Sequence, residues 1–218
     1  MARASTEDAL RMPARGLISV TRTPRAHYRG VMARLSPLVL ALALLAPSLA
    51  LGTVVLSLSF EELTARAPLV VQATVHASNT DWDSEHAKIW TWTELVVKDT
   101  LKGERVSTVL VKQPGGIVGE IGQHVSGAAE FKEGEEVVLF LEPAPDERGA
   151  WVPVSMSASK VTLEDRFGVR VARRDLAGLA FATPGKQFVA QPADEREVVG
   201  NADAFLTRIR TAVKRGAK

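Results

Sequence analysis

The feature that most constrains this chain is an uncharged apolar run from Leu35 to Leu58, which follows a cationic residue. A cation, a Leu/Ala-rich stretch, and then Pro47 with small residues up to Ala50 form the layout of a secretory signal peptide. We therefore assign residues 32–50 to a signal peptide that is cleaved after Ala50 or after Gly52. The run is also long enough to span a bilayer, so an uncleaved membrane anchor over residues 35–58 is the alternative. In both cases the domain that follows is exported, to the periplasm or the extracellular medium.

The positive charge of the chain belongs to its first 50 residues. They hold seven of the 27 Lys and Arg residues but two of the 25 acidic residues, so the remainder has a net charge of −3. Six of these arginines lie in residues 1–31, a stretch without helical or strand periodicity. We interpret residues 1–31 as a disordered extension or a misassigned start. Without a basic face on the remaining domain, no nucleic-acid partner is expected.

The chain contains no cysteine. This excludes disulfides, a thiol nucleophile and thiolate metal ligands from its chemistry. The 168 residues after residue 50 suffice for one domain with a sizeable core. No cofactor is predicted, because the clustered glycines match neither a dinucleotide fingerprint nor a P-loop; these are Gly115, Gly116, Gly119 and Gly122.

Short β-branched segments separated by glycine-containing turns dominate the exported part, with one helix before them and one after. Ser59 and Glu62 form a capping box for the first helix. A β-barrel domain is predicted over residues 51–181, a linker over 182–200 and an amphipathic helix over 201–218. The fold class is therefore mainly β with flanking helices, as a small OB-like β-barrel, with a β-sandwich as the alternative. The predicted strands are 69–76, 89–101, 106–112, 136–141, 151–163 and 167–172.

Several segments taken in order resemble a group of exported bacterial proteins of unassigned function. The resemblance covers residues 57–160, implies a shared exported domain, and brings no catalytic residues. Its segments are Phe60-Glu61-Glu62-Leu63, residues 67–75, Ser78 with Trp82, Leu101-Lys102-Gly103, Gly115-Gly116 with Gly119, Val125-Ser126-Gly127, and residues 131–141.

A looser resemblance links this order of strands and turns to the netrin-like barrel of the tissue inhibitors of metalloproteinases. In both, a long strand ends in a Lys-Gly turn, here Lys102-Gly103, and a Gly-Glu turn, here Gly134-Glu135, leads into an apolar strand. Those inhibitors chelate the protease zinc through an N-terminal cysteine. The absence of cysteine here leaves only the fold as an implication of the resemblance.

The tryptophans are the first candidate for a binding site. Trp90 and Trp92 share one face of a predicted strand, and Trp82 and Trp151 are expected to lie near them. An exposed row of indoles would stack on sugars or peptide side chains. The alternative is that the indoles form one wall of the core, with the threonine face of the strand outward.

Metal ligation and serine catalysis have weaker signals. Asp81, Asp83 and His86 are candidate metal ligands in a polar loop, and His76 and His124 are the other two histidines after residue 50. These residues match no metal motif, and a solvated loop explains them as well. The segment Ser157-Ala158-Ser159-Lys160 has the spacing of serine acyl-enzymes. Its neighbours predict a strand, in which positions i and i+3 point to opposite faces, so a catalytic pair is not expected.

The sequence therefore favours an exported, non-catalytic binding or interaction domain. Its partner would be a protein, a peptide or a glycan, and it would contact a membrane only through an uncleaved leader. An exported metal-dependent hydrolase that uses the scattered histidines and acids is one alternative. Another is an envelope structural protein or protease partner that docks through an exposed apolar stripe on its C-terminal helix, formed by Phe205, Leu206 and Ile209.

Overall fold

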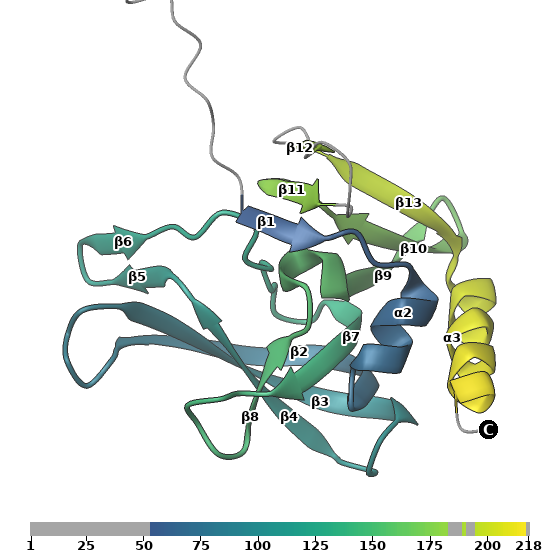
Figure 1. The fold of residues 1–218 in the computed structure, drawn as a ribbon, viewed down its shortest axis with the longest axis horizontal. Helices are drawn as coiled ribbons and strands as arrows, with labels where there is room; N and C mark the ends of the chain where they lie inside the picture. The colour runs from purple at the N-terminus through teal and green to yellow at the C-terminus, as the bar shows by residue number, and fades with distance from the viewer. Residues whose placement is uncertain (1–52, 183–188, 191–194, 217–218) are drawn as a thin grey trace, which may run out of the picture. The chain divides into compact units, whose positions relative to one another are not determined.

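The computed structural model describes residues 53–182, 189–190 and 195–216, and all of them belong to one unit, Ala50–Lys218. The predictions made for residues 1–31 and for the signal peptide at 32–50 lie outside the described residues. Within these residues the chain is mainly β with two flanking helices, as predicted (Figure 1).

One eight-stranded sheet organises the molecule, and five of its strands close into a ring. The ring closes because β7 pairs with both β2 and β8, while β8 also pairs with β4. The structure shows a closed ring of five strands, and that this ring is an OB-like barrel stays a prediction. In sheet order the strands are β13 (Arg196–Asn201), β10 (Val169–Asp175), β9 (Lys160–Arg166), β7 (Glu136–Pro143), β2 (Leu69–Trp82), β3 (Ile89–Lys102), β4 (Thr108–Pro114) and β8 (Ala150–Pro153).

Strand β7 divides one of its edges between two neighbours. Leu141–Pro143 pairs with β8 and so belongs to the ring, whereas Glu136–Leu139 pairs with β9. The β9–β10 hairpin and β13 therefore continue the sheet outward from the ring (Figure 1). Because Glu136–Leu139 of β7 pairs with β9, the inner face of the ring is continuous there with one face of β9 and β10, here called the inner face of the extension.

Alternation along the ring strands separates two hydrophobic cores. Val137, Leu139 and Leu141 of β7 point into the ring, and Val138 and Phe140 point out of it. The buried residues inside the ring come from four strands, β2, β3, β4 and β7; they are Leu69, Val71, Ala73, Val75, Leu95, Val109, Val111, Val137, Leu139 and Leu141.

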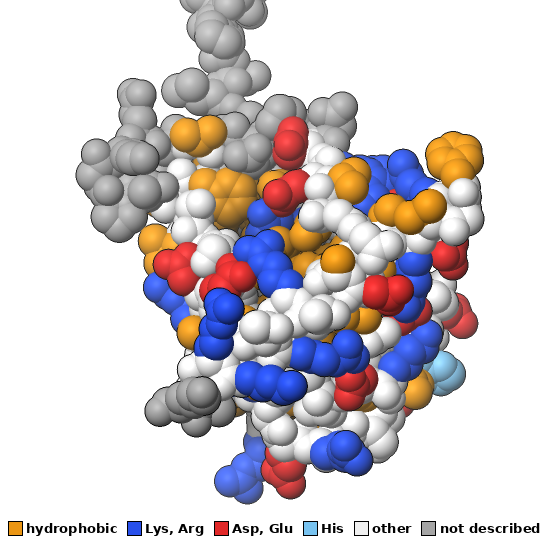
Figure 2. Space-filling model, turned by 90° about the vertical axis from the view of Figure 1, so that its right-hand side faces the viewer, with side chains coloured by type: hydrophobic (Ala, Val, Ile, Leu, Met, Phe, Trp, Pro, Cys, Tyr) orange, Lys and Arg blue, Asp and Glu red, His pale blue; other side chains and the backbone are white. Residues whose placement is uncertain are grey.

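The outer core lies between the sheet and helices α2 (Phe60–Arg66) and α3 (Ala202–Gly216). The predicted capping box is confirmed, because Ser59 Oγ accepts from the Glu62 amide while the Glu62 carboxylate accepts from the Ser59 amide. Phe60 meets Phe205 edge-on at 5.0 Å between ring centroids. The face that carries α3 shows Lys and Arg side chains with Asp and Glu interspersed (Figure 2).

The apolar stripe of α3 is buried, so the prediction of an exposed docking stripe is wrong. Phe205, Leu206 and Ile209 all pack into the outer core, and Arg208 pairs with Glu61 of α2 at 2.7 Å. The helix is part of the domain. None of the helices in the described part of the chain has the length and apolar character of a membrane span.

Three predicted segments differ from the structure. The strand predicted over 69–76 continues to Trp82, so Asp81 lies in β2 and not in a loop. Residues 196–200, predicted as the end of a linker of which 183–188 and 191–194 lie outside the described residues, belong to β13 and pair with β10. The predicted strand 151–163 is interrupted by the 3₁₀ helix η1 (Met156–Ser159), where Met156 has a φ of +52° and the Ser159 hydroxyl accepts from the Ser155 amide. A polar Ser-rich segment offers its backbone such local hydrogen bonds, which compete with strand pairing.

Short strands complete the fold. In a small second sheet, β1 (Thr53–Leu56) pairs in parallel with β11 (Leu179–Ala182), and β11 pairs with β12 (Val189–Ala190). The glycine-rich stretch forms a hairpin of β5 (Gly116–Val118) and β6 (Ile121–Gln123).

Truncation of Phe205 tests whether α3 is integral to the domain. Phe205→Ala removes a buried ring that packs on Phe60, and we expect it to lower the free energy of unfolding by about 3–5 kcal/mol. Urea unfolding followed by tryptophan fluorescence measures this loss. Thr211→Ala, an exposed change on the same helix, should stay within about 0.5 kcal/mol of the wild type. Equal effects of the two changes would contradict an integral helix.

Candidate functional site

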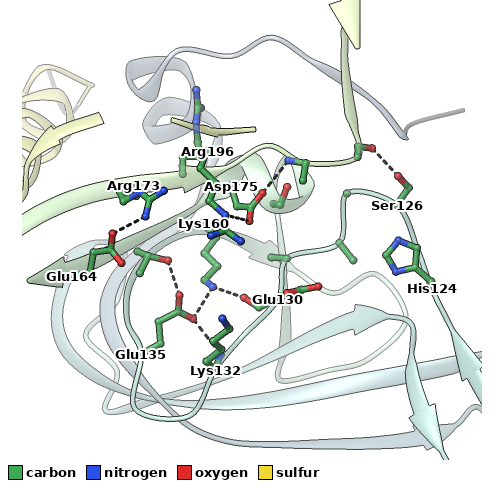
Figure 3. A pocket seen from close by; sticks show the side chains of 18 residues that line it. His124, Ser126, Glu130, Lys132, Glu135, Lys160, Glu164, Arg173, Asp175 and Arg196 are labelled. Atoms are coloured by element: carbon green, nitrogen blue, oxygen red, sulfur yellow. Dashed lines mark hydrogen bonds and ion pairs between the residues drawn. The ribbon is translucent and has the colours of Figure 1, made fainter. Parts of the chain in front are cut away.

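A pocket of about 540 Å³ lies where the inner face of β9 and β10 meets the loops at 124–132 and 176–178 (Figure 3). It is the continuation of the ring interior described above, at the end where β7 leaves β8 for β9. Its lining holds basic and acidic side chains together with small residues and one histidine, and no Phe, Tyr or Trp side chain. The charged lining residues are Lys132, Lys160, Arg173, Arg174, Arg196, Glu130, Glu135, Glu164 and Asp175.

An ion pair whose two side chains are mostly buried forms one wall of this pocket. The Lys160 ammonium lies 2.7 Å from a Glu135 carboxylate oxygen, donates to the carbonyl oxygen of Glu130, and sits 5.0 Å from the centroid of the Phe131 ring. The second Glu135 oxygen accepts from the Thr162 hydroxyl at 2.7 Å. Burial lowers the pKa of Lys160, and the carboxylate beside it acts in the opposite direction. Because the Lys160 ammonium and the Glu135 carboxylate both have partners within the protein, the pair forms a fixed part of the pocket wall.

Two buried polar atoms in the lining lack a hydrogen-bond partner among the described residues. One is the Ser157 hydroxyl, in a residue that is 5% exposed, and the other is Arg173 Nε. The Arg173 Nη1 atom donates to Glu164 at 2.9 Å, which fixes the direction of the guanidinium and leaves its Nε–H unused (Figure 3). Buried polar groups are normally paired, so both atoms are candidates to bind a ligand group.

The loop opposite β9 and β10 is held in place by hydrogen bonds to its backbone. The Ser157 amide donates to the Gly127 carbonyl at 2.9 Å, and the Ser126 hydroxyl donates to the Gly178 carbonyl at 2.8 Å. Gly127 has a φ of +79°, and a Cβ there would collide with the side chain of Leu179. The pocket is therefore a preformed feature of the fold.

The Ser157/Lys160 spacing gains a different explanation from the one expected. Ser157 lies in the 3₁₀ helix η1, Lys160 is the first residue of β9, and both line the pocket. The strand geometry used to reject a pair was therefore wrong. In the structure the Lys160 ammonium is bound to Glu135 and the Glu130 carbonyl, and it makes no hydrogen bond to the Ser157 hydroxyl. A charged lysine that is engaged elsewhere cannot activate a hydroxyl.

Trp90 and Trp92 lie together on the outer face of β3, half-buried, around a cation of this same chain. The Lys112 ammonium is 4.4 Å from the Trp90 ring centroid and 5.6 Å from that of Trp92. It pairs with Asp146 at 2.7 Å and with Glu147 at 3.1 Å. Burial opposes the charge of Lys112, but these two carboxylates outweigh it and raise the pKa of the lysine. The indole pair holds an internal ammonium ion.

The other two tryptophans lie on the opposite face. Trp82 pairs with buried Ile89 and stacks on His86, and Trp151 packs against the core inside the ring. Thr93, predicted to face outward if the indoles formed the core, is 1% exposed and points inward. The structure therefore brings together two of the four candidate residues and supports neither the exposed indole row nor the indole wall of the core.

The candidate metal ligands are used locally. Asp81 accepts a hydrogen bond from the amide of Trp82, and Asp83 accepts one from the amide of Ala87, which lowers the pKa of Asp83. No group of three or more His, Asp or Glu side chains in the described ranges is placed to hold a metal ion. Of the three histidines, His124 alone lines the pocket.

Comparison with known proteins assigns this chain to no family. No protein-family model matches it, and the search of curated proteins gives no match. The resemblances to exported bacterial proteins and to netrin-like barrels therefore stay predictions.

Loss of the Glu135 carboxylate should destabilise the protein in a pH-dependent way. Glu135→Gln leaves a buried ammonium without its counter-ion, and we expect a loss of about 3–5 kcal/mol at pH 7. The pKa of Lys160 then falls further in the folded state, so that the unfolded chain binds more protons up to the ordinary lysine value of about 10.4. Stability should therefore rise as the pH rises toward 10.

Urea unfolding at pH 7, 8.5 and 10 measures this trend. Glu133→Gln, in the same turn but exposed, is the matched control and should change stability by less than about 0.5 kcal/mol at each pH. A loss in Glu135→Gln that does not vary with pH would show that the buried ammonium is not its cause.

Proposed function

We propose that this domain is an exported, non-catalytic binding module and that the pocket beside β9 and β10 is its ligand site. The observation that carries the proposal is a preformed pocket of about 540 Å³ that contains a buried hydroxyl and a buried guanidinium Nε without partners among the described residues. Concave sites with a few convergent polar groups are where proteins bind small ligands and chain segments.

The chemistry of the lining favours a peptide or protein segment over a glycan. Both basic and acidic groups line the pocket, which suits a ligand that carries amide groups and charges of either sign. Sugar sites use aromatic rings as stacking surfaces. The pocket lining has no Phe, Tyr or Trp ring, and Trp90 and Trp92 are occupied with Lys112. The metal-dependent hydrolase has no support from the placement of the histidines.

Export is proposed from the apolar run and from the boundary of the folded domain. The end of that run, Thr53–Leu56, forms β1 and pairs with β11. A leader that ends near residues 50–52 leaves β1 free to take this place.

N-terminal sequencing of the protein recovered from the cell envelope and the culture supernatant tests export and cleavage together. We expect a chain that begins at residue 51 or 53 in one of these fractions, because the residues that precede β1 have the layout of a cleavage site. Recovery of the intact 218-residue chain from the cytosol would contradict the proposal.

Ligand class is tested by NMR titration of the ¹⁵N-labelled protein. Its probes are the tripeptides Gly-Glu-Gly, Gly-Lys-Gly and Gly-Ala-Gly, and the oligosaccharides maltotriose and chitotriose. We expect at least one charged tripeptide to shift the amides of Gly127, Ser157 and Arg173, because they surround the unpartnered atoms. Arg173→Gln should weaken that binding about tenfold or more, as expected when a charged hydrogen bond is lost.

The matched control is Arg166→Gln, because Arg166 also pairs with Glu164, at 2.7 Å, but does not line the pocket. It should leave the tripeptide affinity unchanged. Shifts caused by the oligosaccharides alone, or no shift at the pocket with any probe, would overturn the proposed ligand class.

A further inference from the structure

The turn of the β9–β10 hairpin carries an aromatic ring that neither local conformation nor packing explains. Phe167 and Gly168 have φ values of +51° and +80°, as in a type I′ turn, whose first position favours Asn, Asp or Gly. Phe167 is fully exposed, at 105% of its reference surface, so it buries no apolar area. A bulky residue kept in an unfavourable backbone region and in water points to a role in binding.

Strand register connects this ring to the pocket. Val169, Val171 and Arg173 occupy every second position of β10 and so lie on one face of the sheet, and Val198 of β13 lies opposite Arg173. Arg173 lines the pocket, as does Arg196, which precedes Val198 by two residues on β13. Val169, Val171 and Val198 therefore continue the pocket face beyond the pocket, and Phe167 lies in the turn at the end of this face. These four residues are here called the apolar row.

The apolar row is open and has a polar border. Val169 is 52% exposed and Val198 is 61% exposed, whereas Ala172, on the opposite face of the sheet, is buried against the helices. Beside the row on the same face, Glu164 and Arg166 of β9 lie opposite Val171 and Val169. A small apolar centre bordered by charged residues is the usual anatomy of a protein-binding surface.

We infer that the pocket receives the charged part of an extended polypeptide segment of another protein, whose neighbouring apolar side chains lie on the apolar row. This inference rests on the proposed function. Side chains on one side of an extended segment repeat every two residues, or about 6.6–6.8 Å, which is the spacing between Val169 and Val171 along β10. The partner segment has a charged residue followed by alternating apolar residues.

The charges around the hairpin favour a polypeptide over a lipid surface. Arg166 pairs with Glu164 at 2.7 Å, and Arg170 pairs with Glu136. Asp165 adds an exposed negative charge beside the turn. With its cations neutralised in this way, the hairpin offers no surplus positive charge to anionic headgroups, and the one ring and three valines of the apolar row make a small membrane anchor.

Fluorescence anisotropy with matched labelled hexapeptides tests the inference. The probes are Glu-Val-Thr-Val-Thr-Val and Lys-Val-Thr-Val-Thr-Val, each compared with a version in which serine replaces valine. We expect at least one valine peptide to bind tenfold or more tighter than its serine version. Val198→Ser and Phe167→Asn should each reduce that ratio at least threefold. Phe167→Asn suits the turn, so the variant should melt no lower than the wild type.

Val54→Ser is the matched control, because Val54 is 51% exposed on β1, outside the apolar row, and this change should leave the ratio intact. If charged tripeptides bind in the pocket while valine and serine hexapeptides bind equally, the inference is wrong and the proposed function stands. If neither tripeptides nor hexapeptides bind, both are wrong.

Two further readouts identify a different occupant of the apolar row. Flotation with vesicles of phosphatidylglycerol that is lost in Phe167→Asn would assign the row to a lipid surface. Sedimentation velocity that shows a dimer in the wild type and a monomer in Val198→Ser would assign it to a second copy of this chain. Either result overturns the inference.

Discussion

The division of one edge of β7 between β8 and β9 is the constraint on which the rest of the structure depends. Pairing with β8 closes the ring, and pairing with β9 carries the sheet beyond it. Because the strand alternates, Val137 and Leu139 face one core while Val138 and Phe140 face the other. The pocket lies where the ring face passes into the extension. A shift of β7 by one residue would exchange its two faces and disturb both cores and the pocket together.

Much of the fold follows from local patterns in the sequence. The capping box at Ser59 and Glu62, the glycine-rich hairpin, and the buried strand at 136–141 each have a strong local signal. The interruption at Met156–Ser159 and the strand at 196–201 could not be found this way. The first depends on a left-handed backbone at Met156 and a hydrogen bond to Ser159, and the second on a neighbour, β10, more than twenty residues earlier in the chain.

The candidate site was much less visible in the sequence than the fold. Its lining comes from residues 124–135, 157–164, 173–178 and 196, and none of these segments carries a binding motif. The Ser157/Lys160 spacing does mark two residues of the pocket lining, but a strand was predicted for this segment, and a strand would place the two side chains on opposite faces. The tryptophans, by contrast, have a strong signal because indoles are rare and bulky, yet Trp90 and Trp92 surround Lys112. Residue type alone does not distinguish a ring that binds a ligand from one that shields an internal charge.

The pairing of charges in the pocket limits what a ligand can gain there. A group that displaced Glu135 from Lys160 would have to replace the ion pair and the hydrogen bonds that Glu135 accepts from the Thr162 hydroxyl and the Lys132 amide, so this wall stays closed to exchange. Arg173 differs, because Glu164 holds one nitrogen while Nε has no partner in the described part of the chain. A donor already oriented costs a ligand little ordering on binding. Selectivity in this pocket therefore depends on Arg173 and Ser157 more than on the larger number of charges around them.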